Sequence, residues 1–131
     1  MKVLVDTCVW SLALRRHKVN KSDLINQLED LILDQRVQII GAIRQELLSG
    51  IKNQKQFYKL KNYLRSFPDL VLDENDYELA ANFYISCRNN GIQGSNTDFL
   101  ICAVAVNRGM KIFTSDKDFE QFRKIINISL Y

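Results

Sequence analysis

The sequence has few of the residue types that build functional sites from nitrogen and sulfur. Its one histidine, His17, argues against a zinc site built on histidines and against a histidine general base. Three cysteines, Cys8, Cys87 and Cys102, are odd in number and lie apart within apolar stretches. This pattern is typical of buried thiols in a reducing compartment rather than of a disulfide framework or a zinc site.

Long hydrophobic runs are also missing. No apolar run is long enough to span a bilayer, and no secretory signal pattern precedes the first strand-like run. We therefore expect a cytoplasmic, unprocessed protein with no membrane partner. The formal net charge of +3 favours no particular class of partner. A composition of 47% hydrophobic and 25% charged residues predicts a single globular domain, residues 1–131, around one core.

Strand-like and helical patterns alternate along the chain. The strand-like runs are short and continuously apolar, as a parallel sheet covered on both faces requires, and lie at 2–5, 37–40, 70–72, 111–113 and 125–130. Helical patterns lie at 7–14, 22–34 (with Ser22 as N-cap), 42–50, 53–67, 75–91, 96–109 and 117–124. This order predicts an α/β fold, a three-layer α/β/α sandwich with a mostly parallel central sheet.

Carboxylates stand where the expected strands end or the next helices begin. Asp6 ends the first strand, and Asp116 follows the fourth strand, with Asp118 two residues later. Asp98 lies in the first turn of a nearly all-apolar helix, and Glu46 lies one turn into the helix after the second strand. Because ligands of open α/β sheets bind beyond the carboxyl ends of the strands, we expect these acids to share one rim.

Each acid also has an ordinary structural explanation. Asp6 is placed to cap the next helix, and Asp98 to interact with the positive end of its own helix. Asp116 and Asp118 suit a turn or a weak capping box, and Glu46 alone suits a solvated helix face. These roles do not explain acids at four separate rim positions. Converging carboxylates repel one another unless a cation binds, and oxygen ligands select Mg²⁺ or Mn²⁺, which predicts metal-assisted attack of water on a phosphodiester.

The segments VLVDTCVW, RQELLSG, NTDFLICAVAVNRG and IFTSDKDFEQF resemble, in this order, the motifs of the PIN-domain nucleases, particularly the small bacterial VapC-type toxins. The resemblance covers Lys2 to about Phe122. It implies a catalytic and metal-binding set of Asp6, Glu46, Asp98 and Asp116. It also implies that Thr7 and Thr114 orient these acids. Family members differ in the position of the last acid, so Asp118 is a further candidate metal ligand.

The same resemblance implies a function and partners. The protein is expected to be a PIN-like, Mg²⁺- or Mn²⁺-dependent endoribonuclease, the toxin of a toxin–antitoxin pair, with an RNA substrate, a VapB-type antitoxin and a homodimeric state. The antitoxin is expected on the first two helices, where Trp10 and Leu14 face either the core or a groove against Leu24, Leu28 and Leu31. Two alternatives stay open, an RNA-processing nuclease that is not a toxin and a non-catalytic module that binds RNA or protein.

Two basic clusters favour an RNA substrate. Arg15 and Arg16, followed by Lys18 and Lys21, come just after the first expected helix, and we interpret the two arginines as substrate-binding. The segment 52–65 carries five basic residues, three aromatic residues and no acid. Basic surface beside an acidic site is what contact with a phosphate backbone uses. The alternative for 52–65 is a solvated helix face with its aromatic side chains in the core.

Overall fold

The computed structural model describes residues 1–14 and 23–131 of the protein. Three short strands, β1 (Val3–Val5), β2 (Val37–Gln38) and β3 (Lys111–Phe113), form a parallel sheet in the order β2-β1-β3. Val3 of the central strand pairs with Val37 on one side and with Lys111 on the other. The carboxyl ends of the strands therefore leave the sheet at the same edge, where the sequence places Asp6 and Asp116.

Two of the five expected strands are absent from the described residues as strands. At 70–72 and 125–130 the sheet is extended only by isolated parallel bridges, Ile39 with Asp69 and Ile112 with Leu130. Ile126 and Ile128 are buried, so the run 125–130 packs on the core, and only its end hydrogen-bonds to β3, through the Ile112 N–H and the Ser129 carbonyl. The prediction of a mostly parallel sheet is confirmed.

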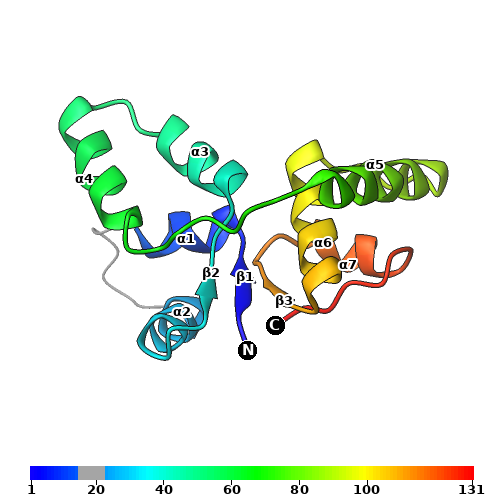
Figure 1. Ribbon diagram of the computed structural model, residues 1–131, viewed down its shortest axis with the longest axis horizontal. Helices are drawn as coiled ribbons and strands as arrows, with labels where there is room; N and C mark the ends of the chain where they lie inside the picture. The colour runs from blue at the N-terminus through cyan, green and yellow to red at the C-terminus, as the bar shows by residue number, and fades with distance from the viewer. Residues whose placement is uncertain (15–22) are drawn as a thin grey trace.

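Seven helices occupy the described ranges. They are α1 (Thr7–Ala13), α2 (Asp23–Leu33), α3 (Gly41–Ser49), α4 (Gln54–Leu64), α5 (Glu74–Asn89), α6 (Asn96–Arg108) and α7 (Asp118–Arg123). All seven were predicted, with ends that differ by at most three residues. In Figure 1, α1 to α4 lie on the β2 side of the strands and α5 to α7 on the β3 side, so helices flank the sheet as the α/β sandwich predicts. The expected N-cap Ser22 lies outside the described residues.

The core is centred on β1, α6 and the aromatic side chains around them. All three residues of β1 are buried, and so is the α6 run from Ile101 to Ala105. Trp10 is completely buried, with its ring edge-on to Phe67 at 5.1 Å between centroids. Trp10 is therefore a core residue, and of the two orientations left open for it the one facing a groove is wrong. Among the helices of residues 1–14 and 23–131, none has the length and apolarity needed to cross a membrane.

Candidate active site

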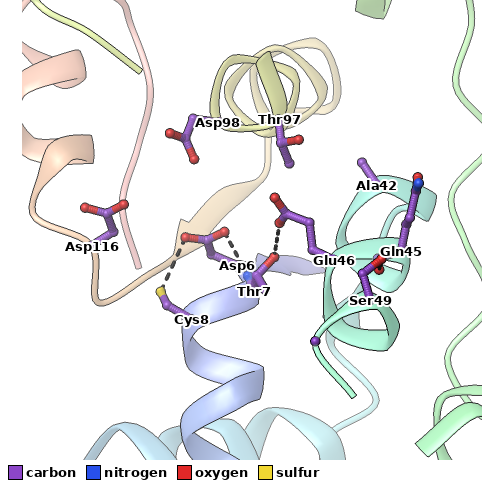
Figure 2. A pocket seen from close by; sticks show the side chains of 11 residues that line it. Asp6, Thr7, Cys8, Ala42, Gln45, Glu46, Ser49, Thr97, Asp98 and Asp116 are labelled. Carbon is purple, nitrogen blue, oxygen red and sulfur yellow. Dashed lines mark hydrogen bonds between the residues drawn. The ribbon is translucent and has the colours of Figure 1, made fainter. Parts of the chain in front are cut away.

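A hollow of about 780 Å³ opens beyond the carboxyl ends of β1 and β3. The four predicted acids line it together: Asp6 after β1, Glu46 on α3, Asp98 on α6 and Asp116 after β3 (Figure 2). They come from four separate elements, so only the tertiary fold brings them to one place. The predicted substrate-binding residues, Arg15 and Arg16, lie outside the described residues.

Asp6 is the buried acid of this hollow, with 6% of its surface exposed. Its Oδ1 accepts a hydrogen bond from the backbone N–H of Thr7 at 2.8 Å and so caps α1. Its Oδ2 accepts hydrogen bonds from the Thr114 hydroxyl at 2.8 Å and from the Cys8 thiol at 3.4 Å. Burial raises the pKa of Asp6, these hydrogen bonds oppose that rise, and the charge of Asp116 adds to it.

The two predicted supporting threonines each hold an acid. The Thr7 hydroxyl donates to Oε1 of Glu46 at 2.6 Å and links the start of α1 to α3 (Figure 2). The Thr114 hydroxyl donates to Asp6 and accepts from the backbone N–H of Asp116 at 3.0 Å. A substitution that removes the Thr7 hydroxyl would therefore take away the hydrogen bond to Glu46, and one that removes the Thr114 hydroxyl would take away one of the three hydrogen bonds to Asp6.

Asp98 is presented by the first turn of α6. Ser95 and Asp98 form a capping box, in which the Ser95 hydroxyl accepts from the Asp98 N–H and Oδ2 of Asp98 accepts from the Ser95 N–H, both at 3.1 Å. Gly94 comes just before, and a Cβ there would lie 2.6 Å from Cζ of Phe122 and 2.9 Å from Cε2 of Phe99. Only glycine lets the chain pass these two rings and bring Asp98 to the hollow.

The structure separates the two candidates for the last acid. Asp116 lines the hollow, whereas Asp118 is exposed at the start of α7 and is not part of the lining. Oδ1 of Asp116 accepts from the backbone N–H of Asp118 at 2.9 Å. The weak capping box that the sequence suggested from Ser115 to Asp118 is wrong, since α7 begins after Lys117 without a side-chain cap.

Six lining residues were not predicted as part of the site: four on or just after α3, namely Ala42, Gln45, Ser49 and Gly50, and two beside the acids at helix starts, Cys8 and Thr97. The Cys8 thiol contacts Asp6 and its sulfur accepts from the backbone N–H of Ser115 at 3.3 Å, so it connects the ends of β1 and β3. Cys8 is only half-buried, whereas Cys87 and Cys102 are buried as expected. Cys8 and Thr97 each stand within two positions of a predicted acid at a helix start, a signal that could have located both.

The acids of the hollow repel one another, and none of the lysines and arginines in residues 1–14 and 23–131 lines it. The pKa of Asp98 is raised by burial first and also by the charges of Asp6 and Asp116. Within residues 1–14 and 23–131, no three His, Cys, Asp or Glu side chains surround one point closely enough to hold an ion between them. Mg²⁺ commonly keeps several waters and takes only one or two carboxylates directly, so this spread set of oxygen donors fits such an ion.

A protein-family model described as PIN domain matches residues 3–125, which confirms the resemblance in the sequence motifs. Among curated proteins, the chain is 27% identical over 130 residues to Ribonuclease VapC11 of Mycobacterium tuberculosis and equally to VapC ribonuclease Mb1587 of Mycobacterium bovis, covering 96% of this chain and 95% of each relative.

Solved structures share the fold. VapBC2 from Rickettsia felis, bound to a DNA fragment from its promoter, superposes with a TM-score of 0.79 at 19% identity, covering 100% of this chain and 98% of the other. FitAcB from Neisseria gonorrhoeae gives a TM-score of 0.76 at 22% identity, covering 98% and 96%. These likenesses confirm the predicted α/β fold.

Proposed function

The chain belongs to the PIN-domain family, and we propose that it is a metal-dependent endoribonuclease that acts as the toxin of a toxin–antitoxin pair. The observation that carries the proposal is the set of four acids, from four separate elements, that line one hollow with no basic side chain from the described part of the chain. The curated relatives, which match over nearly their whole length, are named ribonucleases.

The residues of the hollow suit a metal-dependent hydrolysis. We propose that Asp6, Glu46, Asp98 and Asp116 hold one or two Mg²⁺ or Mn²⁺ ions. A bound ion supplies the positive charge that activates water and offsets the charge developing on the phosphate. Hydrogen bonds from Thr114 and Cys8 hold Asp6, and one from Thr7 holds Glu46.

We also propose partners for the protein. Among structures of the same fold, VapBC-5 from Mycobacterium tuberculosis is described as a member of the VapBC family of toxin–antitoxin systems, and another, from Klebsiella pneumoniae, as a toxin–antitoxin complex. A free ribonuclease in the cytoplasm, where we place this protein, needs restraint, and we propose a VapB-type antitoxin that blocks access to the acids. A homodimer is proposed as well, because closed two-fold pairing is the commonest assembly of small proteins.

The direct test is incubation of the purified protein with total RNA in Mg²⁺ or Mn²⁺, followed by sequencing of the new RNA ends. The wild type should cut RNA, EDTA should abolish cleavage, and either ion should restore it. Asp6→Asn keeps the side-chain shape and removes the charge, so it should cleave RNA orders of magnitude more slowly with its fold retained. Full cleavage in EDTA, or undiminished cleavage by Asp98→Asn, would contradict the proposed metal site.

A second experiment separates a toxin from an RNA-processing nuclease. The chain is expressed in cells with and without the adjoining small reading frame. A toxin should arrest growth when expressed alone and be tolerated with its antitoxin. Cleavage in vitro together with normal growth at high expression would favour the processing enzyme instead.

A further inference from the structure

A second hollow, of about 400 Å³, lies between α3 and α4. It is lined by Gly41, Arg44, Gln45, Leu48, Ser49 and Phe57. Gln45 and Ser49 line the carboxylate hollow as well, so the two depressions adjoin along α3. Figure 2 shows these two side chains on α3 beside Glu46, one of the four acids. A chemical group bound in the second hollow would therefore lie next to a group bound among the acids.

The walls of this hollow, which we call the α3–α4 hollow, are apolar with a free amide at the edge. Leu48 and Phe57 are half-buried and supply the apolar wall. The Gln45 side chain is exposed and makes no hydrogen bond to any residue in the described ranges. Ser49 donates its hydroxyl hydrogen to the Gln45 carbonyl at 2.7 Å but keeps lone pairs that can accept.

Arg44 lines the same hollow but is already engaged. Its Nε donates to Asp69 at 3.0 Å, its Nη1 donates to the Leu64 carbonyl at 3.1 Å, and its Nη2 donates to the Phe67 carbonyl. These bonds tie α3 to the end of α4 and to the segment that follows it. The groups of the hollow that remain free to contact a ligand are the apolar wall of Leu48 and Phe57, the Gln45 amide and the Ser49 hydroxyl oxygen.

The helix that forms the outer wall is strongly basic. Between Gly50 and Pro68 the chain has no acid and carries four lysines, Lys52, Lys55, Lys59 and Lys61. None of these lysines forms an ion pair with another described residue. The aromatic side chains of α4 are not in the core either: Tyr58 is 50% exposed and Tyr63 is 44% exposed. The expectation that this segment is a solvated face with buried aromatics is therefore wrong for these two tyrosines.

We propose that the α3–α4 hollow is a nucleobase subsite, which receives a base of single-stranded RNA beside the phosphate that lies among the acids. Phe57 offers a stacking surface, the Gln45 amide can donate to or accept from the edge of the base, and the α4 lysines contact the RNA backbone. A base within a duplex is stacked on both faces and cannot enter, so the substrate class is single-stranded or looped RNA. This inference rests on the proposed ribonuclease function.

The first test measures binding without cleavage. In an Asp6→Asn background and without divalent metal, a short fluorescein-labelled single-stranded RNA of mixed sequence is titrated by fluorescence anisotropy. Phe57→Ala should weaken binding by about 5-fold to 100-fold, the range found for the loss of one base–aromatic stack. Phe57→Tyr should restore most of the affinity. Tyr77→Ala is the matched control, because Tyr77 is 57% exposed on α5, outside both hollows, and it should not change binding.

A second variant tests the same hollow in case Phe57→Ala disturbs the fold. Gln45→Ala removes an exposed side chain that has no bonding partner, so its melting temperature should match that of the parent. It should weaken binding by about threefold to tenfold, as expected for one hydrogen bond. Lys59→Gln should reduce the slope of log affinity against log salt concentration by about 1.

The last test uses cleavage by the otherwise wild-type protein. Phe57→Ala should raise KM for single-stranded RNA and leave kcat nearly unchanged, whereas Asp6→Asn lowers kcat. The inference is overturned if Phe57→Ala binds and cleaves like the wild type, if the parent does not bind single-stranded RNA, or if a duplex of the same sequence binds equally well. The inference is likewise overturned if Phe57→Ala loses binding to a protein partner while its RNA binding is unchanged. Failure of the proposed function is a separate result, the absence of metal-dependent cleavage by the wild type.

Discussion

Asp6 and Asp76 are the buried polar or charged residues of the described part of the chain, and their surroundings are opposite. Asp76 is 1% exposed, between α5 and α6. Its Oδ1 and Oδ2 accept from Nη1 and Nη2 of Arg108 at 2.6 and 2.9 Å, and Oδ1 also accepts from the Asn107 amide at 3.0 Å. These bonds, those from Arg108 foremost, hold the pKa of Asp76 well below its usual range.

Asp6 is also buried, but from residues 1–14 and 23–131 it receives only neutral donors: a backbone N–H, a hydroxyl and a thiol. Its pKa is raised by burial, and a second acid, Asp116, raises it further. A buried carboxylate is stable where the chain provides a matched cation, and it destabilises the fold where the chain provides none. Asp76 therefore holds α5 and α6 together, whereas Asp6 would be stabilised by a cation bound in the hollow.

The largest expected effect is on catalysis, and only the substitution of Asp6 should show it. Asp6→Asn should lower the rate of RNA cleavage by about 10²- to 10³-fold, the loss typical of one preorganised electrostatic group. Asp76→Asn, assayed well below its melting temperature, should cleave at nearly the wild-type rate because Asp76 lines neither hollow. Equal losses in the two variants would show that burial alone, and not the missing cation, explains the sensitivity of Asp6.

The second effect is on stability, and here the substitution of Asp76 should have the larger effect of the two. Asp76→Asn leaves Arg108 without its ionic partner and should lower the free energy of unfolding by about 3 kcal/mol. Folding lowers the pKa of Asp76, so its contribution is present above the unfolded-state value of 3.8 and is lost as pH falls through the folded-state pKa. Urea titrations should therefore show wild-type stability decreasing below about pH 4. The same stability loss with acid in Asp76→Asn would assign it to other groups.

A third effect tests whether the acids of the hollow store repulsion. Folding raises the pKa of Asp98, so the charged carboxylate costs more free energy in the folded chain than in the unfolded chain. The contribution of Asp98 to stability is therefore greatest below its unfolded-state pKa and is lost as pH rises through its folded-state pKa. Metal-free Asp98→Asn should thus melt above the metal-free wild type at neutral pH. Mg²⁺ at about 100 times its Kd should stabilise the wild type by about 2.7 kcal/mol. No shift with Mg²⁺ and a lower melt in Asp98→Asn would mean that Asp98 only caps α6.

A fourth, smaller effect distinguishes the two acids near α7. Asp116→Asn should reduce cleavage about tenfold more than Asp118→Asn, because Asp116 lines the hollow and Asp118 contributes its backbone N–H. The two variants lose the same charge two positions apart, so each controls for the other. Initial cleavage rates at saturating Mg²⁺ measure the difference, and the opposite ranking would move the fourth ligand to Asp118.

Much of the rim was predictable because local patterns specify it. Asp6 follows a continuously apolar strand, and parallel strands deliver their carboxyl ends to the same edge of the sheet. The contact between Thr7 and Glu46 joins residues 39 positions apart, so its geometry depends on how α3 packs and cannot be read from either segment.

The parts that sequence reasoning missed depend on packing in the same way. An apolar run such as 125–130 pairs as a strand or packs as an irregular segment according to what lies beside it. Here most of the run packs on the core and only its end pairs with β3. Gly94 has the pattern of an ordinary loop residue, and only the tertiary fold shows that the rings of Phe99 and Phe122 occupy the place of its missing Cβ. Asp76 stands in a helix start with ordinary capping signals, and its pairing with Arg108 across 32 positions follows only from the contact of α5 with α6.

The smallest expected effect concerns the weakest of the neutral donors on Asp6. Cys8→Ala removes the thiol that donates to Asp6 and the sulfur that accepts from Ser115, both long contacts of 3.4 and 3.3 Å. The stronger bonds from Thr114 and Thr7 remain, so kcat at saturating RNA should fall only about threefold, the lower end for one hydrogen bond. Cys8→Ser restores a donor and an acceptor and should recover most of the rate. Thr114→Val, which removes the shorter bond, should cost more than Cys8→Ala; if both variants keep the wild-type kcat, burial of Asp6 orients it without either side chain.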